Sequence, residues 1–153
     1  MNEPTGPRVL SIEEANALVP EVAMLVQEQL ELGATIQRLI AELRELVPLE
    51  AQQPTDMVDI TLRSEDAAEV RDLKSELGKL VRHYREGWRF VEGLGAIVKD
   101  TRTGLLDFYG KIDDRVVWLC WRPGDASIGH YHELDQGFSG QKPLEPVRRR
   151  MLN

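Results

Sequence analysis

The first half of the chain carries an apolar seam that repeats at alternating spacings of three and four residues. Its positions are Ala15, Leu18, Val22, Leu25, Gln29, Leu32, Ile36, Leu39, Leu43 and Leu46. This spacing returns to the same face of an α-helix every seven residues, so it predicts one long helix with a continuous contact face. Only Gln29 in the seam is polar. A chain with this pattern must place a second apolar surface along that face.

The sequence also marks where this helix begins and ends. The run Ser11-Ile-Glu-Glu14 is a capping box, in which the two outer side chains satisfy each other's backbone amides, so we expect the helix to begin at Ile12. Pro20 falls inside the seam and predicts a kink near that residue. Pro48 ends the pattern and opens a connection over residues 48–62.

A second seam fits the first as an antiparallel partner. Ser64 is its expected N-cap. The seam positions are Val70, Leu73, Leu77, Leu80, Tyr84, Gly87, Val91 and Leu94. Gly87 costs about 1 kcal/mol in a helix, so it either leaves room for Trp88 or a partner's side chain or is simply tolerated. Residues 11–95 are therefore predicted to form a helical hairpin.

The apolar stripe on the first helix is wider than one partner helix can cover. Further apolar positions beside the seam are Val19, Val26, Ile40 and Val47. A stripe of this width needs more than one neighbour. We therefore expect the hairpin to self-associate as a homodimer with coiled-coil packing, and another protein partner stays open. A non-enzymatic interaction module is the first functional hypothesis.

After Gly93 and Gly95 the chain changes from a helical period to short alternating runs. These runs predict strands at residues 96–99, 105–109, 115–121 and 128–132, with turn sequences between them. The short connections indicate an antiparallel four-stranded meander over residues 96–135, covered by a loop and tail over residues 136–153. The predicted fold class is α+β, in a single domain over residues 1–153.

Charge and composition exclude several classes of partner. The formal net charge is −7 at pH 7, so the chain has no general attraction for nucleic acid. No apolar run reaches the roughly eighteen residues that a membrane-spanning helix needs. Cys120 is the single cysteine, so an internal disulfide cannot form, and charged residues interrupt the N-terminus where an export signal would be apolar. We expect a cytoplasmic protein with no membrane or nucleic-acid partner.

The scarce, chemically reactive side chains gather between Trp118 and Glu133. If the last two predicted strands pair across a five-residue loop, Trp118 lies opposite His130. Strand alternation then gathers one group on a single face: Trp118, Cys120, His130 and His132. A shift of one residue in register would disperse this group. The opposite face would pack against the helices through Val117, Leu119, Trp121 and Tyr131.

This group suggests a binding site, and the rival functional hypothesis is a protein that binds a small molecule or a metal, with enzymatic activity left open. His130 and His132 can hold one metal ion together, and a thiolate at Cys120 would suit zinc or a similar divalent ion. The alternative is that both histidines stack on Trp118 and hydrogen-bond to loop backbone. The apolar run around Cys120 favours a buried thiol over a nucleophile. No catalytic signature is recognisable, which favours a protein that is not an enzyme.

The same region resembles a family of small bacterial proteins known as domain of unknown function 2203. The resemblance is carried by Trp118-Leu-Cys-Trp121, Pro123-Gly-Asp125, Tyr131-His-Glu133, Gly137-Phe-Ser-Gly140 and the opening Ser11–Pro20. It implies one domain over most of the chain and assigns no activity.

Three positions depart from the family pattern. Asp125 stands for a glutamate, Gln141 for an arginine and His130 for an aromatic or aliphatic residue. If His130 is peculiar to this chain, a metal site that requires both histidines is not the family's shared function. His132 with Glu133 is then the better candidate, as a hydrogen-bonded pair beneath the 137–140 loop.

Overall fold

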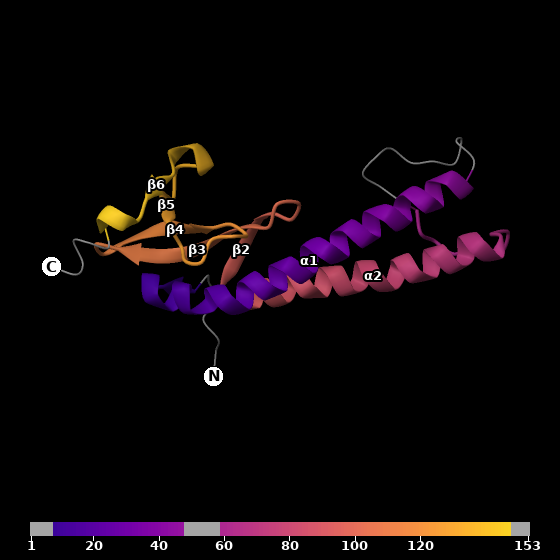
Figure 1. The fold of residues 1–153 in the computed structure, drawn as a ribbon, viewed down its shortest axis with the longest axis horizontal. Coiled ribbons are helices and arrows are strands. Elements are labelled where there is room, and N and C mark those ends of the chain that lie inside the picture. The colour runs from indigo at the N-terminus through magenta and orange to yellow at the C-terminus, as the bar shows by residue number, and fades with distance from the viewer. Residues whose placement is uncertain (1–7, 48–58, 148–153) are drawn as a thin grey trace. The chain divides into compact units, whose positions relative to one another are not determined.

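The computed structural model describes residues 8–47 and 59–147 and has an α+β fold (Figure 1). The chain divides into two compact units, of which the first contains residues 8–28 and 88–147 of the described chain and the second residues 29–47 and 59–87. The start of the first helix and the end of the second therefore belong with the sheet. The sequence had placed that boundary at residue 95, and the single domain stays a prediction.

Helix α1 runs from Ile12 to Leu46, and its start confirms the predicted capping box. The Ser11 amide donates to Glu14 Oε1 at 3.1 Å, and the Glu14 amide donates to Ser11 Oγ at 3.0 Å. Hydrogen bonding to the Glu14 carboxylate by Ser11, first by its amide and then by its side chain, lowers the pKa of Glu14. The helix continues through Pro20 without interruption, and the kink there stays a prediction.

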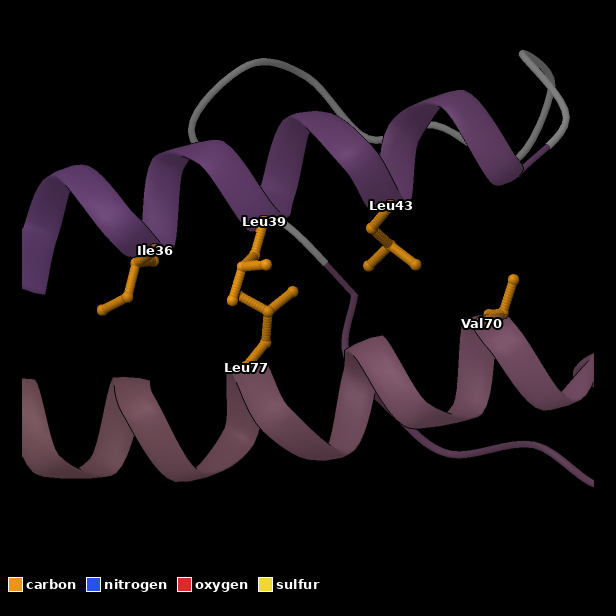
Figure 2. Packing of buried hydrophobic residues seen from close by; sticks show 5 residues of the cluster. All are labelled: Ile36, Leu39, Leu43, Val70 and Leu77. Carbon is orange, nitrogen blue, oxygen red and sulfur yellow. The ribbon is translucent and has the colours of Figure 1, made fainter.

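Helix α2 runs from Ala68 to Gly93 and pairs with α1 in the second unit. The buried core between them consists of Ile36, Leu39, Leu43, Val70 and Leu77. Figure 2 shows the α1 side chains pointing toward α2 and those of Val70 and Leu77 pointing back. All five are positions of the two predicted seams. Because Leu43 lies near the level of Val70 and Leu39 faces Leu77, the helices are antiparallel in this unit, as the sequence predicted.

The start of α2 differs from the prediction. Ser64 is not the N-cap, because residues 63–66 form a turn in which the Arg63 amide donates to Asp66 Oδ2 at 2.8 Å. Lys74 anchors this turn, since its ammonium donates to the Thr61 carbonyl and to Asp66, both at 2.9 Å. Lys74 is only 6% exposed. A buried cation on α2 therefore fixes the chain ahead of the helix, and helical structure begins only at Ala68.

Within the described residues, the sheet of the first unit has six strands. They are β1 (Val9–Leu10), β2 (Ala96–Asp100), β3 (Leu105–Ile112), β4 (Arg115–Trp121), β5 (His130–Glu133) and β6 (Lys142–Pro143). The order is β1-β3-β4-β5-β6, and β2 also pairs with β3. Strand β1 is parallel to β3, the other pairs are antiparallel, and β2 has a bulge between Val98 and Asp100. The predicted meander is thus present, extended by two short strands that the sequence did not indicate.

Strand alternation separates the two faces of the sheet. One face carries side chains that are fully buried: Leu106, Phe108, Val117, Leu119 and Trp121. Helix α1 contributes Asn16 to this unit, and Asn16 Oδ1 accepts the Ile128 amide at 2.7 Å. This hydrogen bond connects the loop before β5 to the first turns of α1.

The pairing of β4 with β5 is shifted by two residues from the predicted register. Trp118 lies opposite His132, and Cys120 lies opposite His130. The shift arises because the Ile128 amide bonds to Asn16 and the Gly129 carbonyl accepts the Leu144 amide at 2.8 Å, so neither residue joins the β4 ladder. A shift by an even number of residues keeps every side chain on its face. The predicted grouping of faces therefore holds in a different register.

Candidate metal centre

Three adjacent strands each contribute one side chain of a kind that can bind a metal ion, and the three side chains form one cluster. Asp107 comes from β3, Cys120 from β4 and His132 from β5, and one ligand atom of each lies within 4.8 Å of the others. Asp107 and Cys120 are direct cross-strand partners, while His132 lies diagonally across from Cys120. All three are buried, with exposures of 3%, 3% and 5%. The fold thus removes a carboxyl, a thiol and an imidazole from water together.

The hydrogen bonds of His132 define the chemistry at the centre. Its Nδ1 lies 3.1 Å from the Glu133 carbonyl oxygen, and its Nε2 lies 3.2 Å from Asp107 Oδ2. A carbonyl oxygen only accepts, so Nδ1 carries a proton and donates it. The lone pair of Nε2 in that tautomer would face a carboxylate oxygen, which is also an acceptor. A proton or a metal cation is needed between these two atoms.

Cys120 is held as a neutral thiol when no metal is bound. Burial is the main cause that raises the pKa of Cys120 to about 12, and the neighbouring Asp107 carboxylate adds to it. Gln141 acts in the opposite direction by donating a hydrogen bond to the sulfur. Both ring nitrogens of His132 already have partners, so the imidazole has no basic atom directed at the thiol. The arrangement therefore does not support a Cys–His nucleophile.

Aromatic rings and one lysine flank the three residues. Trp118 stacks on Tyr109 with ring centroids 4.1 Å apart, and the His132 ring centroid lies 6.2 Å from that of Trp118. The Lys99 ammonium lies 4.3 Å from the centroid of the Trp118 ring. The same ammonium is 4.0 Å from Asp107 Oδ2. Lys99 thus places a positive charge beside the carboxylate that faces His132.

The structure brings together only some of the residues predicted for the site. Cys120 and His132 are in the cluster, and Trp118 lies beside it. His130 lies opposite Cys120 but outside the group of three, and it is partly exposed.

Glu133 lies on the other face, opposite Val117, where Arg115 binds its carboxylate at 2.8 Å and lowers the pKa of Glu133. The predicted His132–Glu133 hydrogen bond exists through the backbone carbonyl of Glu133. The side chain of Glu133 is therefore not part of the cluster. Its ion pair with Arg115 fixes the position of Glu133, whose backbone carbonyl orients His132.

Asp107 was not predicted as a site residue. Its sequence signal is an acidic residue between Leu106 and Phe108 in the middle of an apolar strand. Both neighbours are fully buried, whereas Asp107 is directed to the opposite face, where it is also buried. A buried carboxylate is rare unless it is paired or binds a metal. An acidic residue within an apolar strand could therefore have indicated Asp107 as a candidate site residue.

Comparison with known proteins gives a family and no activity. Residues 8–144 match the model of DUF2203, described as an uncharacterized conserved protein family. The chain belongs to DUF2203. The DUF2203 match includes both helices, all six strands and the three residues of the cluster. No curated protein and no solved structure matches the chain.

Among the residues that the structure describes, no helix has the length and apolarity needed to cross a membrane.

Proposed function

We propose that this protein binds one divalent transition-metal ion, with zinc as the best fit, through Asp107, Cys120 and His132. The observation that carries the proposal is that each ring nitrogen of His132 faces an acceptor oxygen. Nδ1 faces the Glu133 carbonyl, and Nε2 faces Asp107 Oδ2. Nε2 and Asp107 Oδ2 are 3.2 Å apart, while Nδ1 is occupied by the Glu133 carbonyl. Two ligand atoms of a tetrahedral zinc ion, each at about 2.0–2.1 Å from the metal, are about 3.3–3.4 Å apart. The observed separation is close to one edge of such a tetrahedron.

The donor set also suits a borderline-soft dication. Carboxylate oxygen, imidazole nitrogen and thiolate sulfur are the three ligand types that zinc accepts, and catalytic zinc sites use three protein ligands. A bound metal deprotonates a coordinating thiol, so the high pKa of the metal-free Cys120 describes only the empty state. The thiolate and the carboxylate would together neutralise the charge of the ion.

The surroundings of His132 match those of a metal ligand. A ligating histidine usually donates its second ring N–H to a carbonyl or carboxylate, which fixes the tautomer and directs the free nitrogen at the metal. The Glu133 carbonyl has this role here, and the Arg115–Glu133 ion pair holds that residue in place. Asp107 takes the position in the ligand set that the sequence had assigned to His130. A thiol ligand must stay reduced, which agrees with a cytoplasmic setting.

The test is metal analysis of the untagged chain, followed by zinc titration of the protein after removal of metal with a chelator. We expect one ion per chain. His132→Gln and Asp107→Asn keep the size of each side chain but remove a ligand, so the affinity should fall by more than the roughly 10–100-fold typical of outer-shell changes.

His130→Gln is the matched control, because it removes a histidine from the same face outside the cluster and should change the affinity less than tenfold. An unchanged affinity in His132→Gln, or a wild-type chain that takes up no zinc, would contradict the proposal.

Self-association of the hairpin is the second candidate function, and the packing of the second unit favours it. Around the five-residue core of this unit lie apolar side chains that are only partly buried: Leu32, Ile40, Val47, Ile60, Leu73, Leu80, Val81 and Tyr84. Two helices form half of a four-helix bundle, and a second copy of the hairpin would complete it. We infer a homodimer formed in this way.

Light scattering across micromolar concentrations tests the dimer. We expect the mass of a dimer for the wild type and of a monomer for Ile40→Glu, with Met24→Glu as the control, because Met24 is 59% exposed in the first unit. A wild-type chain that stays monomeric throughout would count against the dimer and leave the metal site unaffected.

A further inference from the structure

The three proposed ligands leave one position of a tetrahedral metal ion for a further donor. We propose that this position takes an oxygen of a small oxyanion, a carboxylate or a phosphate group, whose charge is paired with Lys99. This inference rests on the proposed metal site. Closed structural zinc sites have four protein ligands, whereas sites with three keep a position for water or an exogenous ligand.

The charge around the centre favours an anion in that position. A dication with one carboxylate and one thiolate is neutral, and Lys99 adds one positive charge that these ligands do not cancel. The Lys99 ammonium is 4.0 Å from Asp107 Oδ2, which is beyond hydrogen-bonding distance. The face of the Trp118 ring attracts the cation but accepts no conventional hydrogen bond. The ammonium can therefore donate to an arriving ligand oxygen without breaking a hydrogen bond to Asp107.

The exposure of the neighbouring residues indicates the side from which a ligand arrives. The side chains of Asp107, Cys120 and His132 are buried, but Lys99 is 39% exposed, and Trp118 and His130 are partly exposed on the same face. The amide of Gln141 lies against the sulfur of Cys120. An oxyanion has two oxygens a short distance apart, so one can bind the metal while the other accepts from Lys99.

Gln141 is the competing donor, because its carboxamide oxygen could occupy the fourth position after a change of rotamer. The site would then be closed, and Lys99 would have only a local structural effect. The two arrangements differ in what an added anion does to the metal, which makes them separable by experiment.

The experiment uses the full chain loaded with Co²⁺, whose visible absorption reports changes in the coordination sphere. Acetate and inorganic phosphate are titrated separately at constant ionic strength. We expect a saturable spectral change with at least one of them. We expect Lys99→Met to weaken that anion's binding about tenfold, the low end of the effect of a hydrogen bond to a charged group, and Lys99→Arg to retain it.

The amount of bound cobalt is measured in every variant, so that loss of the metal is not mistaken for loss of the anion. Lys111→Met is the matched control, because Lys111 is an exposed lysine of β3 that pairs with Asp114 away from the cluster. It should bind the anion as the wild type does. Circular dichroism of each variant confirms that the fold is kept.

The outcomes separate the two proposals. A chain that binds no cobalt overturns the metal site and this inference together. A chain that binds cobalt but shows no response to either anion, or responds equally in Lys99→Met, overturns this inference alone. A cobalt spectrum that changes in Gln141→Ala and ignores both anions assigns the fourth position to Gln141.

Discussion

Gly87 of α2 leaves the space that the side chain of Gln29 occupies between the two helices. A Cβ built on Gly87 would overlap the Gln29 carboxamide. Gln29 Nε2 donates to the Tyr84 carbonyl at 2.7 Å, and the residue is only 5% exposed. The one polar position of the first seam is therefore matched to a glycine of the second. The occupant is neither Trp88 nor a partner's side chain, the two that the sequence suggested.

Replacing Gly87 with alanine should destabilise the protein, although alanine is the better helix former by about 1 kcal/mol. The added methyl group would displace Gln29 and break its bond to Tyr84, at a net cost of roughly 1–3 kcal/mol. Urea denaturation measures this difference. Gly78→Ala is the matched control, because its Cβ would meet only Ile60 Cδ1 at 3.9 Å, an ordinary contact.

We expect Gly78→Ala to gain up to about 1 kcal/mol of stability. The double variant Gln29→Ala with Gly87→Ala should recover part of the loss, because the two side chains no longer compete for one space. Equal effects of alanine at positions 78 and 87 would show that Gln29 does not need the glycine.

Leu77 is the most buried residue of the core in the second unit, with no exposed surface. Leu77→Ala should therefore lower the free energy of unfolding by about 2–5 kcal/mol through lost burial and a residual cavity. Leu46→Ala offers a comparison on α1, since Leu46 is 40% exposed and should change stability by no more than about 0.5 kcal/mol. Chemical denaturation followed by circular dichroism gives both values, and a loss at Leu77 no larger than at Leu46 would contradict the packing in Figure 2.

The thiol of metal-free Cys120 should react slowly with alkylating reagents. Its pKa of about 12, against 9.0 for an ordinary thiol, reduces the thiolate fraction at pH 8 about a thousandfold. We expect the rate of iodoacetamide labelling at pH 8 to fall by at least that factor relative to the same chain unfolded in urea. Labelling of the folded chain at the unfolded rate would show that Cys120 is accessible and ionised.

The same shift predicts a dependence of stability on pH. The folded state holds the Cys120 proton more tightly than the unfolded state, so this contribution is complete below pH 9 and decreases as the pH rises from 9 toward 12. The test compares urea midpoints of the metal-free wild type and of Cys120→Ala from pH 8 to 10.5. The difference between the two curves isolates the contribution of the Cys120 thiol from that of other titrating groups. The wild type should lose more stability than the variant over this range, and parallel curves would argue against a buried neutral thiol.

Glu14 gives a second pH dependence, with the opposite sign. Hydrogen bonds from Ser11 lower the pKa of Glu14 below the ordinary glutamate value of 4.5. The carboxylate therefore stabilises the helix start fully above pH 4.5, and this contribution is lost as the pH falls through the lowered pKa. Glu14→Gln keeps a capping side chain that does not titrate.

The stability difference between the wild type and Glu14→Gln should shrink between pH 6 and pH 3. Glu13→Gln is the control, since it removes the same charge from the same helical turn and leaves the Ser11 contacts in place. A difference that is constant over this range would show that the capping box does not depend on ionised Glu14.

Local sequence signals predicted the features that local interactions determine. The capping box at Ser11 needs only residues three apart, and the two seams need only a helical period, so both were readable from the chain. Ser64 failed as a cap because Lys74, a full ten residues later, fixes the preceding turn through Asp66. No local pattern in residues 64–68 contains that interaction.

The site was predicted in part for the same reason. Alternation along β4 and β5 placed Cys120 and His132 on one face, and this survived a shift in register by two residues. The size of the shift depends on Asn16, which lies more than a hundred residues before the loop that it binds. Asp107 enters the cluster through pairing of β3 with β4, and its role depends on partners from two other strands.

The outer strands of the sheet limit how other chains can add to it. Strands β1 and β6 have two residues each, β6 contains Pro143, which has no amide hydrogen to donate, and β2 carries a bulge between Val98 and Asp100. Short strands, prolines and bulges at a sheet edge are known protections against strand addition. In the part of the chain that the structure describes, these features disfavour the addition of further strands at the sheet edges. The edge strands are therefore poor surfaces for the homodimer proposed above, and the helical hairpin is the surface that the proposal uses.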